Sequence, residues 1–153
     1  MKARDIMSAN VVTVGPDTAV REIARLLLDK QITAMPVVDQ NGAPIGMISE
    51  EDLIGPDDAT REARRDWWLT LLAEGEPLSS AFLEWLHSQR RTAGYLMSKP
   101  VISIDEDADV RDIARLLAAH HIKRVPVVRN GRVVGIVSRG DLLRALFLSD
   151  PNA

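Results

Sequence analysis

Residues 20–27 read VREIARLL and residues 110–117 read VRDIARLL, so one eight-residue helical pattern occurs twice with a single change. Around this pair, residues 7–38 align with 97–128 at an offset of 90, and after a one-residue deletion residues 42–54 align with 131–143. A copy of about 50 residues is too small to bury a stable core alone. We therefore expect the two copies to pack on each other as one folding unit.

Each copy shows the same succession of patterns. Short β-branched runs predict strands, apolar residues at i, i+3, i+4 and i+7 predict amphipathic helices, and Asn-Gly pairs predict tight hairpin turns. The resulting order is β-α-β-β-α, twice. The predicted elements are strands at 11–14 and 101–104, helices from Val20 and Val110, strands at 36–38 and 126–128, strands at 45–48 and 133–137, and helices opened by Ser49 and Ser138.

Composition excludes several classes of function. The 153 residues contain no Cys and three His, which removes disulfide frameworks and thiolate metal sites and leaves little for any other metal site. A formal net charge of −3 argues against a nucleic-acid partner. No apolar run is long enough for a membrane span or a secretory signal, so a cytoplasmic protein is expected. The sequence shows neither a nucleophile paired with a base nor a glycine-rich phosphate loop, so an enzyme is not expected.

Two sets of motifs, at matching offsets, carry a family resemblance. They are an h-x-x-x-P-V-V strand at 32–38 and 122–128, the Asn-Gly hairpin, and G-h-h-S-x-x-D at 46–52 and 135–141. The chain resembles a tandem pair of cystathionine-beta-synthase (CBS) domains, or Bateman module. The resemblance implies an α/β (α+β) fold of two repeats related by a pseudo-twofold axis. It also implies clefts between the copies that bind adenine nucleotides or related adenosyl ligands, with a regulatory and non-catalytic role.

The Ser-x-x-Asp element has two interpretations. An aspartate can accept hydrogen bonds from both hydroxyls of a ribose, and a helix N-terminus can receive a phosphate. Alternatively, Ser138 with Asp141, like Ser49 with Asp52, forms a capping box that only starts a helix. Both remain open, and the family resemblance favours the ligand role for Asp141.

Charge separates the two copies. Residues 1–54 carry five Lys or Arg and eight Asp or Glu, whereas residues 95–153 carry nine and seven. The resemblance implies that Lys123, Arg124 and Arg139 contact phosphate, although an ordinary solvated face is the alternative. The first copy has Thr33, Ala34 and Glu50 at these places, so its site is expected to be weak, empty or purely adenosine-like.

The resemblance also implies an adenine slot in each copy. All of its residues are equally ordinary core positions. The predicted main ligand site comprises Ile102, Ser103, Lys123, Arg124, Val125, Pro126, Ile136, Ser138, Arg139 and Asp141. The weaker second site comprises Val12, Thr13, Ala34, Met35, Pro36, Met47, Ser49 and Asp52. No catalytic and no metal-binding residue is predicted.

Between repeat 1 (1–54) and repeat 2 (95–153), residues 55–94 match neither copy and hold all three Trp. Two helices are predicted there, at 60–74 and 78–88. This aromatic surface is covered either by the module itself or by a second subunit. The insert resembles that of bacterial CBS-pair proteins that also carry a BON domain. No such domain follows here, which leaves a stand-alone relative and a fragment as alternatives.

Two functions remain from these patterns. The first is a regulatory homodimer, assembled through residues 60–88, that binds AMP, ADP or ATP mainly at the Asp141 site and signals to an unknown effector protein. No cofactor is required. The second is a dimerising interaction scaffold whose ligand clefts are vestigial. The cations of the second copy favour the sensor, and the acidic residues 50–52 of the first copy favour the scaffold.

Overall fold

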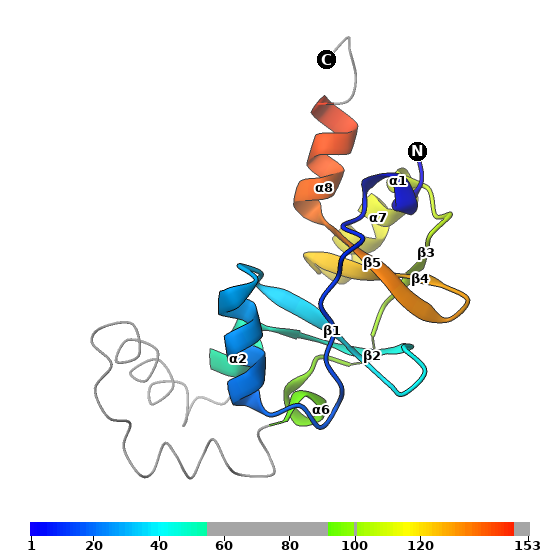
Figure 1. The fold of residues 1–153 in the computed structure, drawn as a ribbon. Helices are drawn as coiled ribbons and strands as arrows, with labels where there is room; N and C mark the ends of the chain where they lie inside the picture. The colour runs from blue at the N-terminus through cyan, green and yellow to red at the C-terminus, as the bar shows by residue number, and fades with distance from the viewer. Residues whose placement is uncertain (55–91, 100, 149–153) are drawn as a thin grey trace, which may run out of the picture. The chain divides into compact units, whose positions relative to one another are not determined.

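The structure, a computed structural model, describes residues 1–54, 92–99 and 101–148. The predicted mixed α/β fold is confirmed, and the helix-strand-strand-helix part of each repeat follows the expected order (Figure 1). A short helix that the sequence patterns did not predict precedes it, at Ala3–Ile6 in one repeat and at Ala93–Leu96 in the other. The predicted helices at 60–74 and 78–88, and the three tryptophans with them, lie outside the described residues.

Among the described residues, the elements of the two repeats correspond one to one except at the first strand and at the turn that ends repeat 2. Repeat 1 contains α1 (Ala3–Ile6), α2 (Val20–Asp29), β1 (Ala34–Val38), β2 (Pro44–Ser49) and α3 (Glu50–Ile54). Repeat 2 contains α6 (Ala93–Leu96), which begins two residues before the predicted boundary at 95, and then β3 (Ile104–Asp105), α7 (Val110–His120), β4 (Arg124–Arg129), β5 (Arg132–Ser138) and α8 (Arg139–Leu143), followed by the π-helical turn η1 (Arg144–Leu148).

The strand predicted at the start of each repeat is shorter than its sequence pattern indicated. Of residues 11–14 only Val14 makes a bridge, and of residues 101–104 only Ile104 lies in a strand. The Val14 N–H donates to the Pro36 carbonyl over 3.2 Å. In an extended residue the N–H and C=O point to the same side, and proline has no N–H to continue the ladder toward Val12. The prediction of full strands was therefore wrong.

The described chain divides into two compact units, and neither coincides with one sequence repeat. Unit 1 comprises Met1–Thr13, Val38–Ile45 and Pro100–Ala153, and unit 2 comprises Val14–Val37 and Gly46–Lys99. Each unit thus takes its leading segment, with α1 or α6, from the other repeat. In unit 1, Ser8 and Ile136 exchange backbone hydrogen bonds of 3.0 and 3.1 Å.

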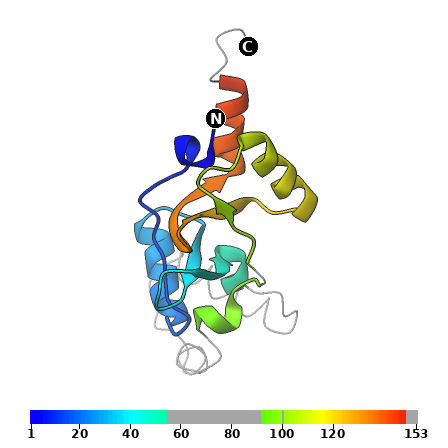
Figure 2. The ribbon, with the colours of Figure 1, turned by 90° about the vertical axis from the view of Figure 1, so that its right-hand side faces the viewer.

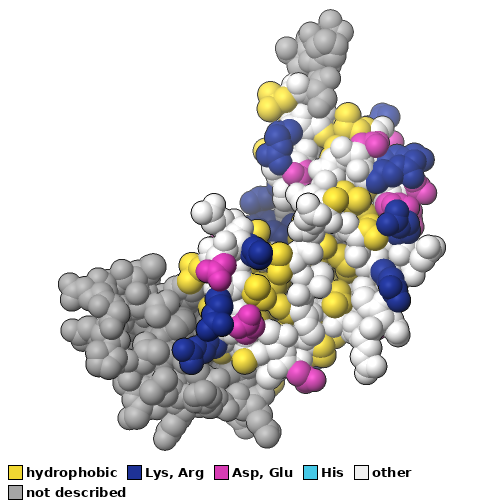
Figure 3. Space-filling model, in the orientation of Figure 1, with side chains coloured by type: hydrophobic (Ala, Val, Ile, Leu, Met, Phe, Trp, Pro, Cys, Tyr) yellow, Lys and Arg dark blue, Asp and Glu magenta, His cyan; other side chains and the backbone are white. Residues whose placement is uncertain are grey.

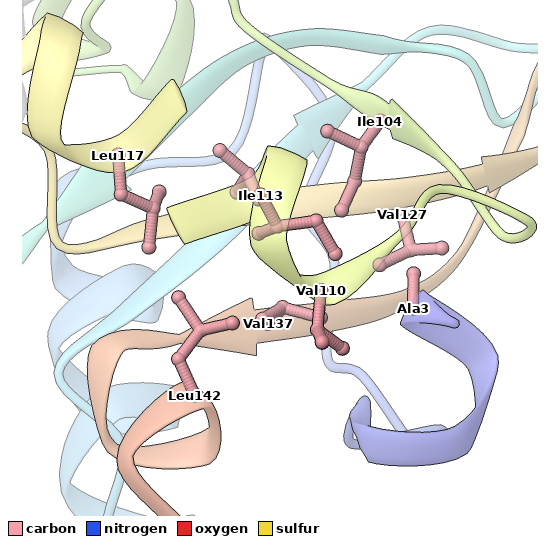
Figure 4. Close-up of a cluster of buried hydrophobic side chains, with 9 residues drawn as sticks. Ala3, Ile104, Val110, Ile113, Leu117, Val127, Val137 and Leu142 are labelled. Atoms are coloured by element: carbon pink, nitrogen blue, oxygen red, sulfur yellow. The ribbon is translucent and has the colours of Figure 1, made fainter. Parts of the chain in front are cut away.

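The core of unit 1 lies between the sheet β3-β4-β5 and the helices (Figures 1 and 4). The 3.6-residue period of α7 places Val110, Ile113 and Leu117 on the buried face, and Ile113 is fully buried. Ala3 of α1 and Leu142 of α8 complete the cluster. Because the sequence of α7 repeats that of α2, the equivalent residues Val20, Ile23 and Leu27 are buried in unit 2.

Gly135 in β5 explains why the leading segment fits so closely in unit 1. A Cβ at this position would lie 2.4 Å from the Met7 sulfur and 3.0 Å from the Ser8 carbonyl oxygen. Gly46 in β2 has the same relation to Met97, at 2.4 Å from its sulfur. Both glycines are therefore required by the close approach of a methionine from a leading segment.

Gly135→Ala should lower the free energy of unfolding by about 1–3 kcal/mol, because the added methyl overpacks the Met7 contact. The measurement is urea denaturation followed by circular dichroism. Gly15→Ala is the control, because nothing lies within 4 Å of a Cβ there. Adding Met7→Ala to Gly135→Ala should recover part of the loss. Equal effects of Gly135→Ala and Gly15→Ala would contradict the packing argument.

Candidate functional site

The register of β4 and β5 brings the two halves of the predicted main site together. Arg124 pairs with Ser138, and Pro126 pairs with Ile136. Side chains two residues apart on a strand share a face of the sheet. These four residues therefore lie on one face, as a shared ligand slot requires, while Val125 is fully buried in the core cluster.

A backbone hydrogen bond joins the entrance of β4 to the start of α8. The Arg139 N–H donates to the Lys123 carbonyl over 2.9 Å. Together with the pairing of Arg124 and Ser138, this bond places three cationic residues, Lys123, Arg124 and Arg139, at one end of the hairpin. Lys123 and Arg139 are exposed and Arg124 is half-buried. Figure 2 shows α8 continuing directly from β5 at this end.

The same cations border a pocket of about 830 Å³ in unit 1. Its walls come from α7, the segment that leads into β4, and α8 with the start of η1. Leucine, isoleucine and alanine side chains line much of it. Of the predicted site residues it contains Lys123, Arg124, Ser138 and Arg139.

The predicted residues thus fall on two adjoining surfaces of unit 1. Pro126 and Ile136 belong to the face of the sheet and do not line the pocket. Ile102 packs against the hydrophobic core cluster, and Ser103 is exposed just before β3. The structure brings Arg124 and Ser138 to both surfaces.

Asp141 starts α8 in the manner of a capping box. Its Oδ2 accepts the Ser138 N–H over 2.8 Å, and the Ser138 hydroxyl accepts the Asp141 N–H over 3.2 Å. The other oxygen, Oδ1, accepts the Arg144 guanidinium in an ion pair. The capping interpretation is therefore confirmed for this aspartate, and its role toward a ribose stays a prediction. Arg144 had no part in the sequence prediction, because an arginine three residues after an aspartate is an ordinary helix pattern.

Unit 2 repeats the backbone of this site with different side chains. The Glu50 N–H donates to the Thr33 carbonyl over 3.0 Å, which matches the bond from Arg139 to Lys123. The frame is therefore conserved within the chain, while Thr33, Ala34 and Glu50 stand where unit 1 has three cations. On the face drawn in Figure 3, acidic side chains lie close to basic ones, with uncharged surface between these groups.

The predicted second site is divided between the units. Val12 and Thr13 belong to unit 1, and the remaining residues belong to unit 2. Within unit 2, Pro36 and Met35 are buried in β1, while Met47 and Ser49 are half-buried in β2. The Asp52 Oδ2 accepts the Ser49 N–H over 2.8 Å and the Ser49 hydroxyl over 3.2 Å.

Among the predicted site residues, Asp52 has a carboxyl whose pKa is raised, so it is a weaker acid than an ordinary aspartate. Burial raises the pKa of its carboxyl above the ordinary 3.8, and repulsion from Glu51 adds to the rise. Hydrogen bonds from Ser49 and from the Ser98 side chain oppose it. Ser98 comes from the leading segment of repeat 2, so sequence reasoning within one repeat could not find it.

Two further properties concern the described part of the chain. None of its His, Asp and Glu residues gather in groups of three or more that could hold a metal ion. Every helix in it is too short or too polar to cross a lipid bilayer.

Sequence comparison identifies relatives that share both repeats. The sequence profile of the CBS domain matches residues 3–55 and 93–148. The chloroplastic CBS domain-containing protein CBSX2 of Arabidopsis thaliana is 30% identical over 141 residues, covering 89% of this chain and 58% of the relative. The chain therefore spans less than two thirds of the length of this curated relative, and the same is true of CBSX1.

Solved structures of CBS domains resemble the fold along almost the whole chain. The CBS domain of a CBS domain-containing membrane protein from Sphaerobacter thermophilus is 34% identical, with a TM-score of 0.71 over 97% of this chain and 89% of that one. CBSX2 in complex with AMP is 27% identical, with a TM-score of 0.67 and 94% coverage of both chains. The CBS domain pair of MJ0100, in complex with 5′-methylthioadenosine and S-adenosyl-L-methionine, is 25% identical, with a TM-score of 0.67 and coverage of 95% and 94%.

Asp52→Asn should change how stability depends on pH. The native state binds the Asp52 proton more tightly than the unfolded chain, because its native pKa lies above 3.8. Asp52 therefore adds stability below pH 3.8, and this contribution is lost as the pH rises through the native pKa. The free energy of unfolding of the wild type minus that of Asp52→Asn should fall across this window in urea titrations.

Asp109→Asn serves as a control of opposite sign. The Arg111 N–H lowers the pKa of Asp109 below 3.8. Its contribution to stability is present above pH 3.8 and is lost as the pH falls through the native pKa. The free energy of unfolding of the wild type minus that of Asp109→Asn should therefore rise with pH. A difference for Asp52→Asn that rises or stays level with pH would contradict the role assigned to burial.

Proposed function

Because the chain belongs to the CBS domain family, we propose that it is a non-catalytic regulatory module that binds an adenine nucleotide, AMP, ADP or ATP, or a related adenosyl ligand. The site is in unit 1, around the entrance of β4 and the start of α8. This proposal is supported by the relatives whose structures contain adenosyl compounds: AMP in CBSX2, and methylthioadenosine with S-adenosylmethionine in MJ0100.

One observation carries the choice of site. The two units share one backbone hydrogen bond, from the Arg139 N–H to the Lys123 carbonyl in unit 1 and from the Glu50 N–H to the Thr33 carbonyl in unit 2. Only unit 1 combines it with Lys123, Arg124 and Arg139. Cations near a phosphate form charge-assisted hydrogen bonds, whereas the Glu50 carboxylate of unit 2 repels it. A phosphate-bearing ligand therefore binds unit 1, and the unit 2 site is weak, empty or restricted to uncharged adenosine.

Each part of the ligand has a proposed partner. The three cations hold the phosphate, and Ile136, which is half-buried in β5, supplies apolar surface for adenine, whereas Pro126 on the same face is fully buried. Asp141 accepts the ribose hydroxyls through its carboxylate, whose Oδ2 accepts the Ser138 N–H and whose Oδ1 is paired with Arg144 in this structure. Ile102, Ser103 and the backbone of Val125 complete the predicted set.

We propose further that the protein is a homodimer that transmits ligand occupancy to an effector protein in the cytoplasm. On the described surface, several large apolar side chains of α8 and η1 are exposed: Leu143 at 59%, Phe147 at 61% and Leu148 at 79%. Apolar side chains grouped in this way favour burial in an assembly. They support the alternative scaffold equally, because a scaffold also dimerises.

Arg139→Gln should weaken AMP binding about tenfold, the usual size of one charge-assisted hydrogen bond. Adenosine, which lacks the phosphate, should bind the variant and the wild type alike. Isothermal titration calorimetry measures both ligands. Arg129→Gln, at the opposite end of β4, is the control and should leave AMP binding unchanged. If wild-type protein binds no adenosyl ligand at millimolar concentration, the sensor is rejected in favour of the scaffold.

Leu143→Ser combined with Phe147→Ser should shift sedimentation velocity toward the monomer, because the pair removes apolar surface from the proposed interface. Trp67→Ala with Trp68→Ala tests the role predicted for residues 60–88 in the same experiment and should shift the equilibrium in the same direction. Leu28→Ser, another exposed leucine at 53%, is the control. A dimer that survives both double substitutions would reject these two surfaces, and a monomeric wild type would reject the homodimer itself.

A further inference from the structure

The ion pair between Arg144 and Asp141 is unequal in burial. The Asp141 side chain is only 10% exposed, whereas the Arg144 side chain is 65% exposed. The carboxylate is therefore fixed by the start of α8, while the guanidinium can leave it for water or for another anion. If the guanidinium leaves, another hydrogen-bond donor has to replace it at the carboxylate, because an unpaired buried charge is costly.

The Arg144 guanidinium also extends across the first turn of α8. A Cβ built on Gly140 would lie 3.5 Å from Arg144 Nη1. Gly140 itself lines the pocket together with Ser138 and Arg139. The guanidinium thus lies beside the residues proposed to receive the phosphate, and it is held there by the carboxylate proposed to receive the ribose.

The described part of repeat 1, residues 1–54, contains no equivalent of this arrangement. The positions equivalent to Gly140 and Arg144 are Glu51 and Gly55. Gly55 has no side chain to pair with Asp52, and burial raises the pKa of Asp52. At the aligned positions, therefore, the aspartate that is expected to bind a nucleotide has an arginine where the other has a glycine.

We propose that Arg144 determines ligand specificity by exchanging partners, leaving the Asp141 carboxylate for the ligand phosphate as the ribose hydroxyls take its place. This inference rests on the proposed function. A ligand with a phosphate compensates the guanidinium for the lost ion pair. A ligand without a phosphate competes with Arg144 for the Asp141 oxygen and offers the guanidinium no other anion to pair with. Arg144 therefore favours AMP over adenosine in two ways, because it binds the phosphate of AMP and because it competes with adenosine for Asp141.

The experiment measures the affinities of AMP and adenosine for the full chain by calorimetry, in wild type and in Arg144→Gln. The dissociation constant of AMP should rise about tenfold, the usual effect of losing one charge-assisted hydrogen bond. The dissociation constant of adenosine should fall, because its competitor for Asp141 is gone. Arg139→Gln, in contrast, should weaken AMP without strengthening adenosine.

Two variants keep the result interpretable. Arg115→Gln breaks another pair of the same spacing, between Arg115 and Asp112 on α7, and should change neither affinity. Arg144→Lys keeps the charge and should restore most of the preference for AMP. Thermal melting of each variant shows whether the fold is intact.

A double variant tests the exchange itself. In an Asp141→Asn background the ion pair is already lost, so adding Arg144→Gln should no longer strengthen adenosine binding. If Arg144→Gln weakens both ligands equally, or leaves the ratio of the two affinities unchanged, the exchange is overturned while nucleotide binding stands. If the wild type binds neither ligand, the proposed function fails and the exchange with it.

Discussion

The register between β4 and β5 is the constraint on which the site depends. It sets Arg124 opposite Ser138 and Pro126 opposite Ile136, and it leaves Val125 for the core. A slip of one residue would turn every side chain of the strand to the other face of the sheet. Because the buried face is filled by α7 and α8, such a slip would cost the core its packing. The same contacts that stabilise unit 1 therefore keep the three cations together.

Duplication has kept the backbone of this site and changed its chemistry. The hydrogen bond that joins Arg139 to Lys123 recurs between Glu50 and Thr33 with nearly the same length. What differs is the charge beside it, which comes from Lys123, Arg124 and Arg139 in unit 1 and from Glu50 in unit 2. The close methionine contacts at Gly135 and Gly46 are also duplicated, because the two leading segments occupy equivalent places, one in each unit.

Much of the fold could be predicted because the periodic patterns are local. The helices from Val20 and Val110 and the Asn-Gly hairpins depend on residues a few positions apart. The first strands were overestimated because their pairing depends on a partner that contains a proline. The packing of the segments around Ala3 and Ala93 in a unit with elements of the other repeat is a long-range contact that no period reveals. Within the candidate site the cations could be predicted by comparing the two repeats, whereas the role of Arg144 depends on its ion pair with Asp141, which only the structure shows.

The central claim is that the cations at the entrance of β4 and the start of α8 hold the phosphate of an adenine nucleotide. A crystal structure of the full chain grown with AMP tests it most directly. We expect the phosphate oxygens within hydrogen-bond distance of Arg124 or Arg139 and a ribose hydroxyl on the Asp141 carboxylate. A nucleotide found in unit 2 beside Asp52, or a phosphate bound away from these arginines, would contradict the account.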